Sequence, residues 1–469
     1  MFLNEIRVTH MYQEHKITKS NFYLLKKIFV KFSMKNPRKI SKKLHSAPAP
    51  FPSYVIPPAM NLAAALKSAK SNLTSTPTPK ETTTSTQSIQ QRRNFSLQSG
   101  SPDEILKYQK YILKFNLEAW LDLLGDSTFA TKYVPLNRQE AQHLASAYEN
   151  RATTHQAVDP NLKTLQNKLQ IVMDSVAPSG DGCFVKTSSR SAKDYADLNK
   201  LRTTYNQALS HLHNDISENA KMIAMSYASM QLLRMPDAAS TLVVLQNSER
   251  IWHDMKLALS AQGGGSDVLT SNEHGEEKIE WQESLVAREW VVVEPDMEFR
   301  CFITSGKLVA ISQYRHLVYF PRLVANWSMI QQALLQSFDA IHSKLAGTFP
   351  KDDYILDLAI QLNSNYGPES ILKETPLPPE AVTKVWVVEV NPFFETTDGC
   401  LFSWQRDKDV LLGCGSSSDA SAPGSVAYRL REKPAKGCSS LVYGPWQKVL
   451  RNEPFDDAVV VASLADAKT

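Results

Sequence analysis

Two apolar runs late in the chain predict a pair of neighbouring strands. The first covers residues 354–361 and the second residues 385–390, and each is too short and too uniformly apolar for a surface helix. Pro392 ends the second run because proline has no N–H for a sheet ladder. A polar, proline-rich loop over residues 363–383 joins the runs. The pattern therefore predicts a hairpin with a long tip.

Polar side chains interrupt both of these predicted strands. Asp357 lies near the middle of the first, and Glu389 and Asn391 lie two residues apart at the end of the second, where they share one face of the sheet. An ionised carboxylate in an apolar run needs a cation, a donor or a proton. Hard oxygen ligands of this kind suit Mg²⁺, which takes further partners from phosphates. A Mg²⁺–nucleotide site is one interpretation. The other is that Asp357 pairs with an arginine while Glu389 and Asn391 cap the loop after the strand.

Periodicity places further elements along the chain. Helical patterns begin near Ser101 and include an amphipathic segment anchored by Trp120. The remaining predictions are helices over 137–170, 194–235 and 327–345, mixed helix and strand over 238–256, a loop over 263–275, strands over 284–293, 297–303 and 308–314 with a turn at 305–306, and an extended segment over 426–431.

The strand over residues 297–303 alternates in character. Its apolar side chains face one way, and Glu298 and Arg300 face the other. A cross-strand salt bridge accounts for this pattern. A site role accounts for it equally well, since Arg300 beside a triphosphate could hold it in a bidentate manner and neutralise charge.

A short strand at residues 182–187 carries Lys186 into a serine-rich basic loop that contains Ser188, Arg190 and Lys193. Hydroxyl groups and cations that converge after a strand suit an anion, so the loop is a candidate phosphate grip. A solvent-exposed turn is the alternative.

Composition limits the function classes. The chain has 469 residues, is 42% hydrophobic and carries a formal net charge of +4, which is too small to argue for nucleic-acid binding. Its five cysteines form no Cys-x-x-Cys pair, so we expect a reducing compartment with neither a zinc site nor a disulfide framework. No apolar run reaches the length of a membrane span, so we expect a soluble protein.

The first hundred residues differ from the rest. They are basic and acid-poor, then rich in Pro, Ser and Thr, so we expect disorder there. An organelle transit peptide and a solvated tail both fit this composition. We therefore divide the chain into four parts, namely a disordered extension (1–100), an N-terminal lobe with a helical insertion (101–283), a C-terminal lobe with the metal site (284–405), and a linker with a tail (406–469).

These parts predict an α+β fold with two β-rich lobes and antiparallel sheets around an ATP site. No Gly-x-x-x-x-Gly-Lys-Ser/Thr loop and no kinase signature is present, and no Ser, Cys or His stands beside a base, so we assign no catalytic residue. An RNA-binding function for the basic leader is disfavoured, because aromatic residues are not interleaved with its charges.

Several segments resemble, in order, motifs of the cell division cycle protein 123 family. They are Phe184-Val-Lys-Thr-Ser-Ser-Arg-Ser-Ala-Lys-Asp, Ala287-Arg-Glu-Trp, Met297-Glu-Phe-Arg-Cys-Phe-Ile with Ile311-Ser-Gln, and Glu389-Val-Asn-Pro-Phe-Phe-Glu-Thr-Thr-Asp with Leu401-Phe-Ser-Trp. The resemblance runs from about residue 115 to Trp404. It implies an ATP-grasp fold that binds ATP and Mg²⁺. It also implies a monomeric, cytoplasmic assembly chaperone for eukaryotic translation initiation factor 2, acting through its gamma subunit.

The resemblance also implies roles for single residues. Lys186 matches the phosphate-binding lysine, and Ser188 and Arg190 fall at loop positions near the nucleotide. The strand beside adenine is matched by Arg288, Glu289 and Trp290, the arginine of the Glu-Phe-Arg motif by Arg300, and the metal ligands by Asp357, Glu389 and Asn391.

The chain departs from the family pattern at several positions. Ser189 and Ala192 replace a tryptophan and a proline, Glu389 replaces an aspartate, and Phe394 replaces a glycine. Glutamate can supply the same oxygen from a longer arm. About two dozen extra residues lie between Asp194 and Leu232, judged also from ordinary loop lengths. An active ATP-grasp ligase, which couples an acyl phosphate to an amine, is the alternative function.

Overall fold

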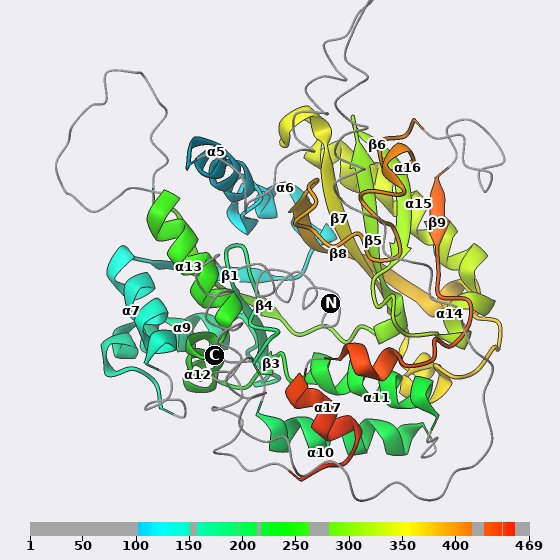
Figure 1. Ribbon diagram of the computed structural model, residues 1–469, viewed down its shortest axis with the longest axis horizontal. Coiled ribbons are helices and arrows are strands. Elements are labelled where there is room, and N and C mark those ends of the chain that lie inside the picture. Colours follow the sequence, from blue (N-terminus) through cyan, green and yellow to red (C-terminus); the bar gives the residue numbers. More distant parts are fainter. Residues whose placement is uncertain are drawn as a thin grey trace, which may run out of the picture. The chain divides into compact units, whose positions relative to one another are not determined.

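The computed structural model describes residues 102–150, 157–195, 197–212, 217–261, 281–414, 426–442 and 444–454. The predicted disordered extension, the loop at 263–275 and most of the Gly/Ser linker after Gly413 lie outside these residues. Within them the chain is α+β with two separate sheets (Figure 1). The predicted α+β class with antiparallel sheets is confirmed.

The first sheet has four strands, and all of its pairs are antiparallel. In spatial order they are β1 (Thr131–Leu136), β4 (Glu283–Glu289), β2 (Cys183–Thr187) and β3 (Arg234–Met235). Strand β1 was not predicted. It contains Pro135, which an edge strand tolerates because one side of its ladder is unpaired.

Four helices share a buried apolar core with this sheet. They are α7 (Arg138–Glu149), α9 (Lys163–Val176), α12 (Ala238–Gln246) and α13 (Glu249–Ala261). A capping box starts α7, where the Asn137 side chain accepts from the Glu140 N–H and Glu140 accepts from the Asn137 N–H. The strand predicted within residues 238–256 is wrong, because Asp237 caps a helix there.

The second sheet has five strands. In spatial order they are β8 (Val382–Pro392), β7 (Tyr354–Leu362), β5 (Glu298–Thr304), β6 (Lys307–Gln313) and β9 (Ala427–Arg429). Only β9 runs parallel to its described neighbour. The β7–β8 hairpin with its long tip is confirmed. So is the turn between β5 and β6, where Ser305 and Gly306 have φ values of 51° and 72°.

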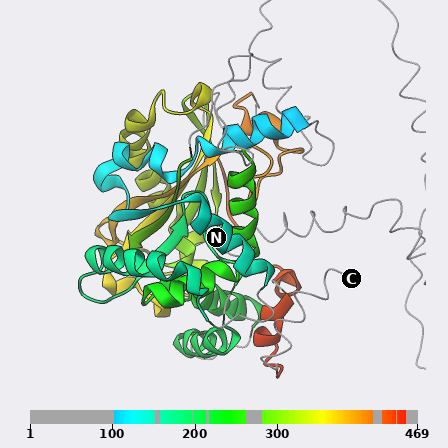
Figure 2. The same ribbon diagram turned by 90° about the vertical axis from the view of Figure 1, so that its left-hand side faces the viewer.

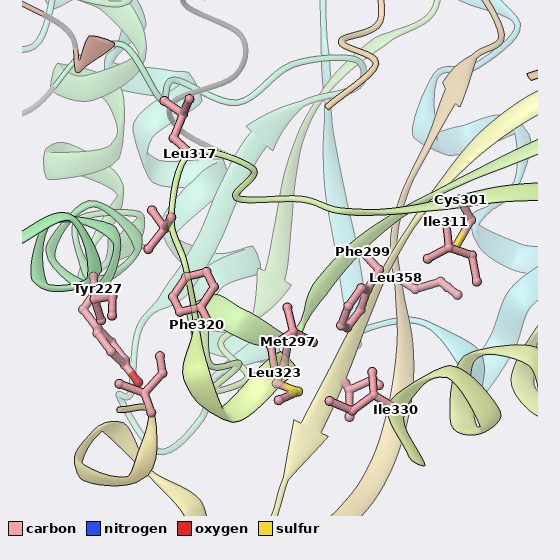
Figure 3. Close-up of a cluster of buried hydrophobic side chains, with 14 of the residues drawn as sticks. Tyr227, Met297, Phe299, Cys301, Ile311, Leu317, Phe320, Leu323, Ile330 and Leu358 are labelled. Atoms are coloured by element: carbon pink, nitrogen blue, oxygen red, sulfur yellow. The ribbon is translucent and has the colours of Figure 1, made fainter. Parts of the chain in front are cut away.

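The helix α15 (Trp327–Leu345), whose bounds match the prediction, covers one face of the second sheet. Its inner side chains, such as Ile330, share a core with Phe299, Cys301 and Leu358 from the strands (Figure 3). Because strand side chains alternate, Arg300 lies on the opposite face. That opposite face carries the polar groups described below.

The helices α10 (Leu198–His211), α11 (Glu218–Gln231) and α17 (Gly444–Leu450) lie side by side (Figures 1 and 2). Their buried side chains belong to the core of the second sheet and not to that of the first. Strand β4, in contrast, belongs to the first sheet. The predicted boundary at residue 284 therefore runs through a strand of the first sheet.

Shorter elements complete the described residues. Trp120 is buried as predicted, but its segment is not one helix, because α5 ends at Leu113 and short turns follow. These elements are α5 (Pro102–Leu113), α6 (Leu121–Leu124), α14 (Pro321–Ala325), α16 (Lys408–Leu411) and the 3₁₀ turns at Leu117–Ala119, Gly125–Ser127, Pro160–Leu162, Pro295–Met297, Pro350–Asp352, Ser364–Tyr366, Pro368–Ser370, Pro379–Ala381 and Cys438–Leu441. No helix in this part of the chain is both long and apolar enough to cross a bilayer.

Candidate functional site

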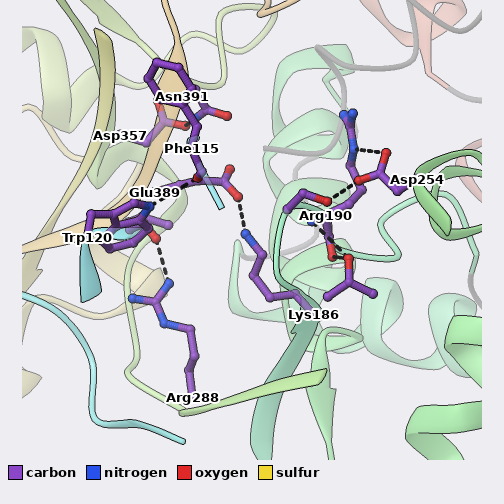
Figure 4. A network of polar contacts seen from close by, with 12 residues as sticks. Phe115, Trp120, Lys186, Arg190, Asp254, Arg288, Asp357, Glu389 and Asn391 are labelled. Atoms are coloured by element: carbon purple, nitrogen blue, oxygen red, sulfur yellow. Dashed lines mark hydrogen bonds and ion pairs between the residues drawn. The ribbon is translucent and has the colours of Figure 1, made fainter. Parts of the chain in front are cut away.

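The β7–β8 hairpin gathers three polar side chains on one face of the second sheet (Figure 4). Asp357 lies directly opposite Glu389 in the antiparallel register, next to an irregularity in the ladder. Asn391 donates a hydrogen bond from Nδ2 to Asp357 Oδ2 over 3.1 Å. The structure therefore brings together the three residues for which the sequence predicts metal ligation.

Arg300, on β5, forms a two-pronged ion pair with Asp357. Its Nε and Nη2 donate to the two carboxylate oxygens over 2.8 and 2.7 Å, and both side chains are almost fully buried. The guanidinium also stacks on the ring of Tyr314, 4.9 Å from its centre. The alternative interpretation of Asp357 as an arginine partner is therefore what the structure contains. Its position beside Glu389 is common to both interpretations.

Burial and neighbouring charges shift the pKa values of the ionisable side chains in this cluster. Burial raises the pKa of Asp357, the Arg300 guanidinium opposes that rise, and the neighbouring Glu389 adds to it. Burial alone would lower the pKa of Arg300, but the carboxylate of Asp357 outweighs burial and raises it. Two buried carboxylates side by side repel each other, and a divalent cation between them would relieve that repulsion.

Lys186, on β2 of the first sheet, reaches the second sheet and donates from Nζ to Glu389 Oε1. Both side chains are buried. Lys193, from the loop that follows β2, is also buried, and its charge lowers the pKa of Asp357. In the sequence Lys193 is one member of the basic loop, and the Lys193-Asp194 pair that ends the loop is the local feature that marks it.

Arg315, which is buried, forms a further ion pair with the partly buried Glu298 beside this cluster, with 3.4 Å between Nη2 and Oε2. The sequence alternation placed Glu298 and Arg300 on one face, and a cross-strand salt bridge was one expectation. Arg300 forms such a bridge, because the ladder sets it opposite Asp357 on the neighbouring strand. Arg315 was not predicted, since it lies in the irregular segment after β6.

Arg288 is fixed between the two sheets by the backbone of β8. Its Nη1 donates to the Val388 carbonyl over 2.6 Å and its Nη2 to Thr128 Oγ1 over 2.6 Å. Burial lowers its pKa to about 10, with Glu389 opposing the change. Glu289 accepts from the Ala130 N–H over 2.9 Å, which ties β4 to the start of β1.

Trp290 buries an indole N–H that has no hydrogen-bond partner in the part of the chain that the structure describes. A buried donor of this kind normally has a partner, so this N–H at the end of β4 is suited to a ligand acceptor. The oxygen ligands of the hairpin and the lysines facing them fit a Mg²⁺–nucleotide complex.

The structure does not bring Ser188 and Arg190 to this cluster. Ser188 Oγ donates to Glu118 Oε1 over 2.6 Å and accepts from the Ser284 N–H over 2.8 Å. Arg190 Nε donates to Asp254 Oδ1 over 3.2 Å. These two residues therefore hold the loop against its neighbours.

Comparison with known proteins finds relatives of this chain. The family model described as D123 matches residues 120–433. A "Cell division cycle protein 123" of Phaeosphaeria nodorum is 30% identical over 164 residues, which is 35% of this chain and 35% of the relative. A "Translation initiation factor eIF2 assembly protein" of Danio rerio is 26% identical over 147 residues, covering 31% of this chain and 36% of the relative. The matched part spans about a third of the length of these relatives.

Among solved structures, the chain is similar to the "Structure of Cdc123 from Schizosaccharomyces pombe" with 19% identity and a TM-score of 0.42, covering 69% of this chain and 98% of that one. The D123 match covers the Lys186 loop, every described strand of the two sheets and the carboxylate hairpin. On the extent of that match, the chain belongs to the D123 family.

Proposed function

We propose that this chain binds ATP with Mg²⁺ at the carboxylate hairpin. Asp357, Glu389 and Asn391 would hold the cation, and Lys186 and Arg300 would hold phosphate oxygens. The observation that carries the proposal is the convergence of buried carboxylates from one sheet with a buried lysine from the other. The strand containing Arg288, Glu289 and Trp290 would border the base, with the indole N–H as a donor.

The charges of the site suit an exchange of partners. In the structure Lys186 and Arg300 neutralise Glu389 and Asp357. A magnesium ion would take over the carboxylates, and the two cations would turn to the phosphates. These charged side chains are already removed from water in the folded protein. Binding therefore requires less desolvation free energy than it would at a site whose charges were still hydrated.

We further propose that the bound nucleotide supports a role in assembly of translation initiation factor 2 in the cytoplasm, through its gamma subunit. The support is family membership and the names of relatives, several of which are called eIF2 assembly proteins. No RNA or membrane partner is part of the proposal.

Titration calorimetry and thermal unfolding test the nucleotide site. Mg²⁺–ATP at a hundred times its Kd should stabilise the wild-type chain by about 2.7 kcal/mol. Asp357→Asn should remove both the heat and the stabilisation. Asp407→Asn is the matched control, because Asp407 is also paired with an arginine, Arg429, outside the hairpin. An unchanged response of the Asp357 variant would contradict the proposal.

Binding to purified gamma subunit, measured with and without Mg²⁺–ATP, tests the assembly role. We expect retention that depends on the nucleotide in the wild type and is lost in Asp357→Asn. Release of ADP that depends on a carboxylic acid and an amine in the same samples would instead support the ligase alternative. Absence of retention with an intact nucleotide response would reject the partner and leave the nucleotide site standing.

A further inference from the structure

A second cluster of metal-ligand side chains lies where the loops after β6 and β8 meet. His316 comes from the first loop, and Asp398 and Cys400 come from the second. One ligand atom from each of the three lies within 4.8 Å of the other two. We propose that these residues form a binding site for a thiophilic divalent cation of the zinc class, separate from the Mg²⁺ site of the hairpin.

The donor set determines the kind of ion. A thiolate, an imidazole nitrogen and a carboxylate oxygen are ligands of Zn²⁺, whereas Mg²⁺ takes oxygen ligands almost exclusively. Zinc–ligand bonds of about 2.0 to 2.3 Å in a tetrahedral site put neighbouring donors about 3.5 Å apart. The three side chains therefore need to close by at most about 1.3 Å, and the fourth position is left for water or an exogenous group.

The backbone around His316 is held in place, so the site does not depend on a loop with few contacts. Gln313 donates from Nε2 to the carbonyls of Arg315 and Val318 over 2.8 and 2.6 Å, spanning the histidine. Arg431 Nε donates to the His316 carbonyl over 3.0 Å. The histidine is 8% exposed.

The loop that carries the other two ligands is equally constrained. The Cys400 N–H donates to Asp398 Oδ1 over 2.7 Å, and Cys400 has a φ of 55°, which folds the chain back on itself. The next residue ties this loop to β6, because the Leu401 N–H donates to Ser312 Oγ over 3.1 Å. Side chains on loops that are held in this way lose little freedom when an ion binds.

The cluster is distinct from the hairpin site but adjoins it. Arg300 Nη1 donates to the Asp398 carbonyl over 2.7 Å, while its other nitrogens hold Asp357. The two sites therefore share a contact with the Arg300 guanidinium and have no metal ligand in common. An ion held by Asp398 and Cys400 would fix the loop to which Arg300 is bonded.

Cobalt titration of the full chain, after treatment with a chelator, tests the proposal. Co²⁺ bound through a thiolate gives a near-ultraviolet charge-transfer band, and Zn²⁺ should abolish the band by displacement. We expect one Co²⁺ per chain, loss of the band in Cys400→Ser and in His316→Gln, and no change in Cys414→Ser, whose free cysteine is exposed. Asp357→Asn should keep the band, which separates this site from the nucleotide site.

Absence of a displaceable band in the wild type would overturn the proposal, as would a full band in either ligand variant. Circular dichroism of each variant establishes that it is folded. Because two ligands on different loops are tested, a folding defect in one variant leaves the other to decide. The absorbance readout is independent of any activity of the chain.

Discussion

The Arg300–Asp357 pair is expected to cost stability when broken and to cost little when replaced as a whole. Both side chains are almost fully buried. Asp357→Asn leaves a buried guanidinium without its carboxylate, and we expect a loss of about 3–5 kcal/mol in the free energy of unfolding. At about 2–4 °C per kcal/mol for a large domain, the melting temperature should fall by about 10 °C.

The double variant Arg300→Met, Asp357→Leu removes both charges and fills the space with apolar atoms. Buried ion pairs exchanged in this way are often neutral or stabilising, so we expect the double variant to recover most of the loss. It should nevertheless show no response to Mg²⁺–ATP. That combination would mean that the pair serves ligand binding and not stability.

Urea unfolding followed by tryptophan fluorescence measures these differences. The control is Asp407→Asn, which breaks the Arg429–Asp407 pair, where the arginine side chain is 37% exposed. We expect less than about 1 kcal/mol there. The reasoning is refuted if Asp357→Asn is as stable as the wild type, or if the double variant is no more stable than the single one.

Three further predictions concern other parts of the fold. Burial beside Asp296 raises the pKa of Glu294 to about 8, with Arg322 opposing the rise. The folded state therefore keeps a proton that the unfolded chain releases near its ordinary pKa, so stability should fall as pH rises towards 8, by up to about 1.4 kcal/mol per pH unit. Glu294→Gln should flatten that dependence in pH-resolved urea titrations. Trp446→Ala should cost about 3–5 kcal/mol in the same assay, because the Trp446 side chain is 1% exposed. Gly399→Ala should weaken Co²⁺ binding, since an added Cβ would lie 2.2 Å from the Phe402 carbonyl oxygen and displace the loop that carries two of the ligands; unchanged cobalt affinity would contradict this.

Local sequence patterns predicted those elements whose signals lie within a short stretch. The helix at Trp327–Leu345 has apolar residues at helical spacing, and the Ser305-Gly306 turn supplies the positive φ values of a tight hairpin. The segment around Leu242 was misread in part, because its β-branched residues favour a strand while Asp237, outside the run, caps a helix. Capping and packing therefore overrode the intrinsic preference of these β-branched residues for a strand.

Pairing between residues that are distant in the sequence could not be predicted from local patterns. Lys186 and Glu389 are 203 residues apart in sequence, and nothing local to either one specifies the other. The partner of Arg190 could not be predicted either. Its basic loop suggested a phosphate as the partner, whereas in the fold Arg190 pairs with Asp254 of α13. The strand β4 was recognised, but its membership of the first sheet depends on two partners, β1 and β2, that lie far from it in the sequence.

The short parallel strand β9 has a practical consequence for working with this protein. It covers the outer ladder of β6, and Tyr428 within it lies against the ring of Trp327 at 5.1 Å between centres. A truncated version that stops before Val426 would present a bare β-edge to solvent, and bare edges recruit other chains. Aggregation of such a fragment would thus reflect a missing cover and not a failure of the remaining fold.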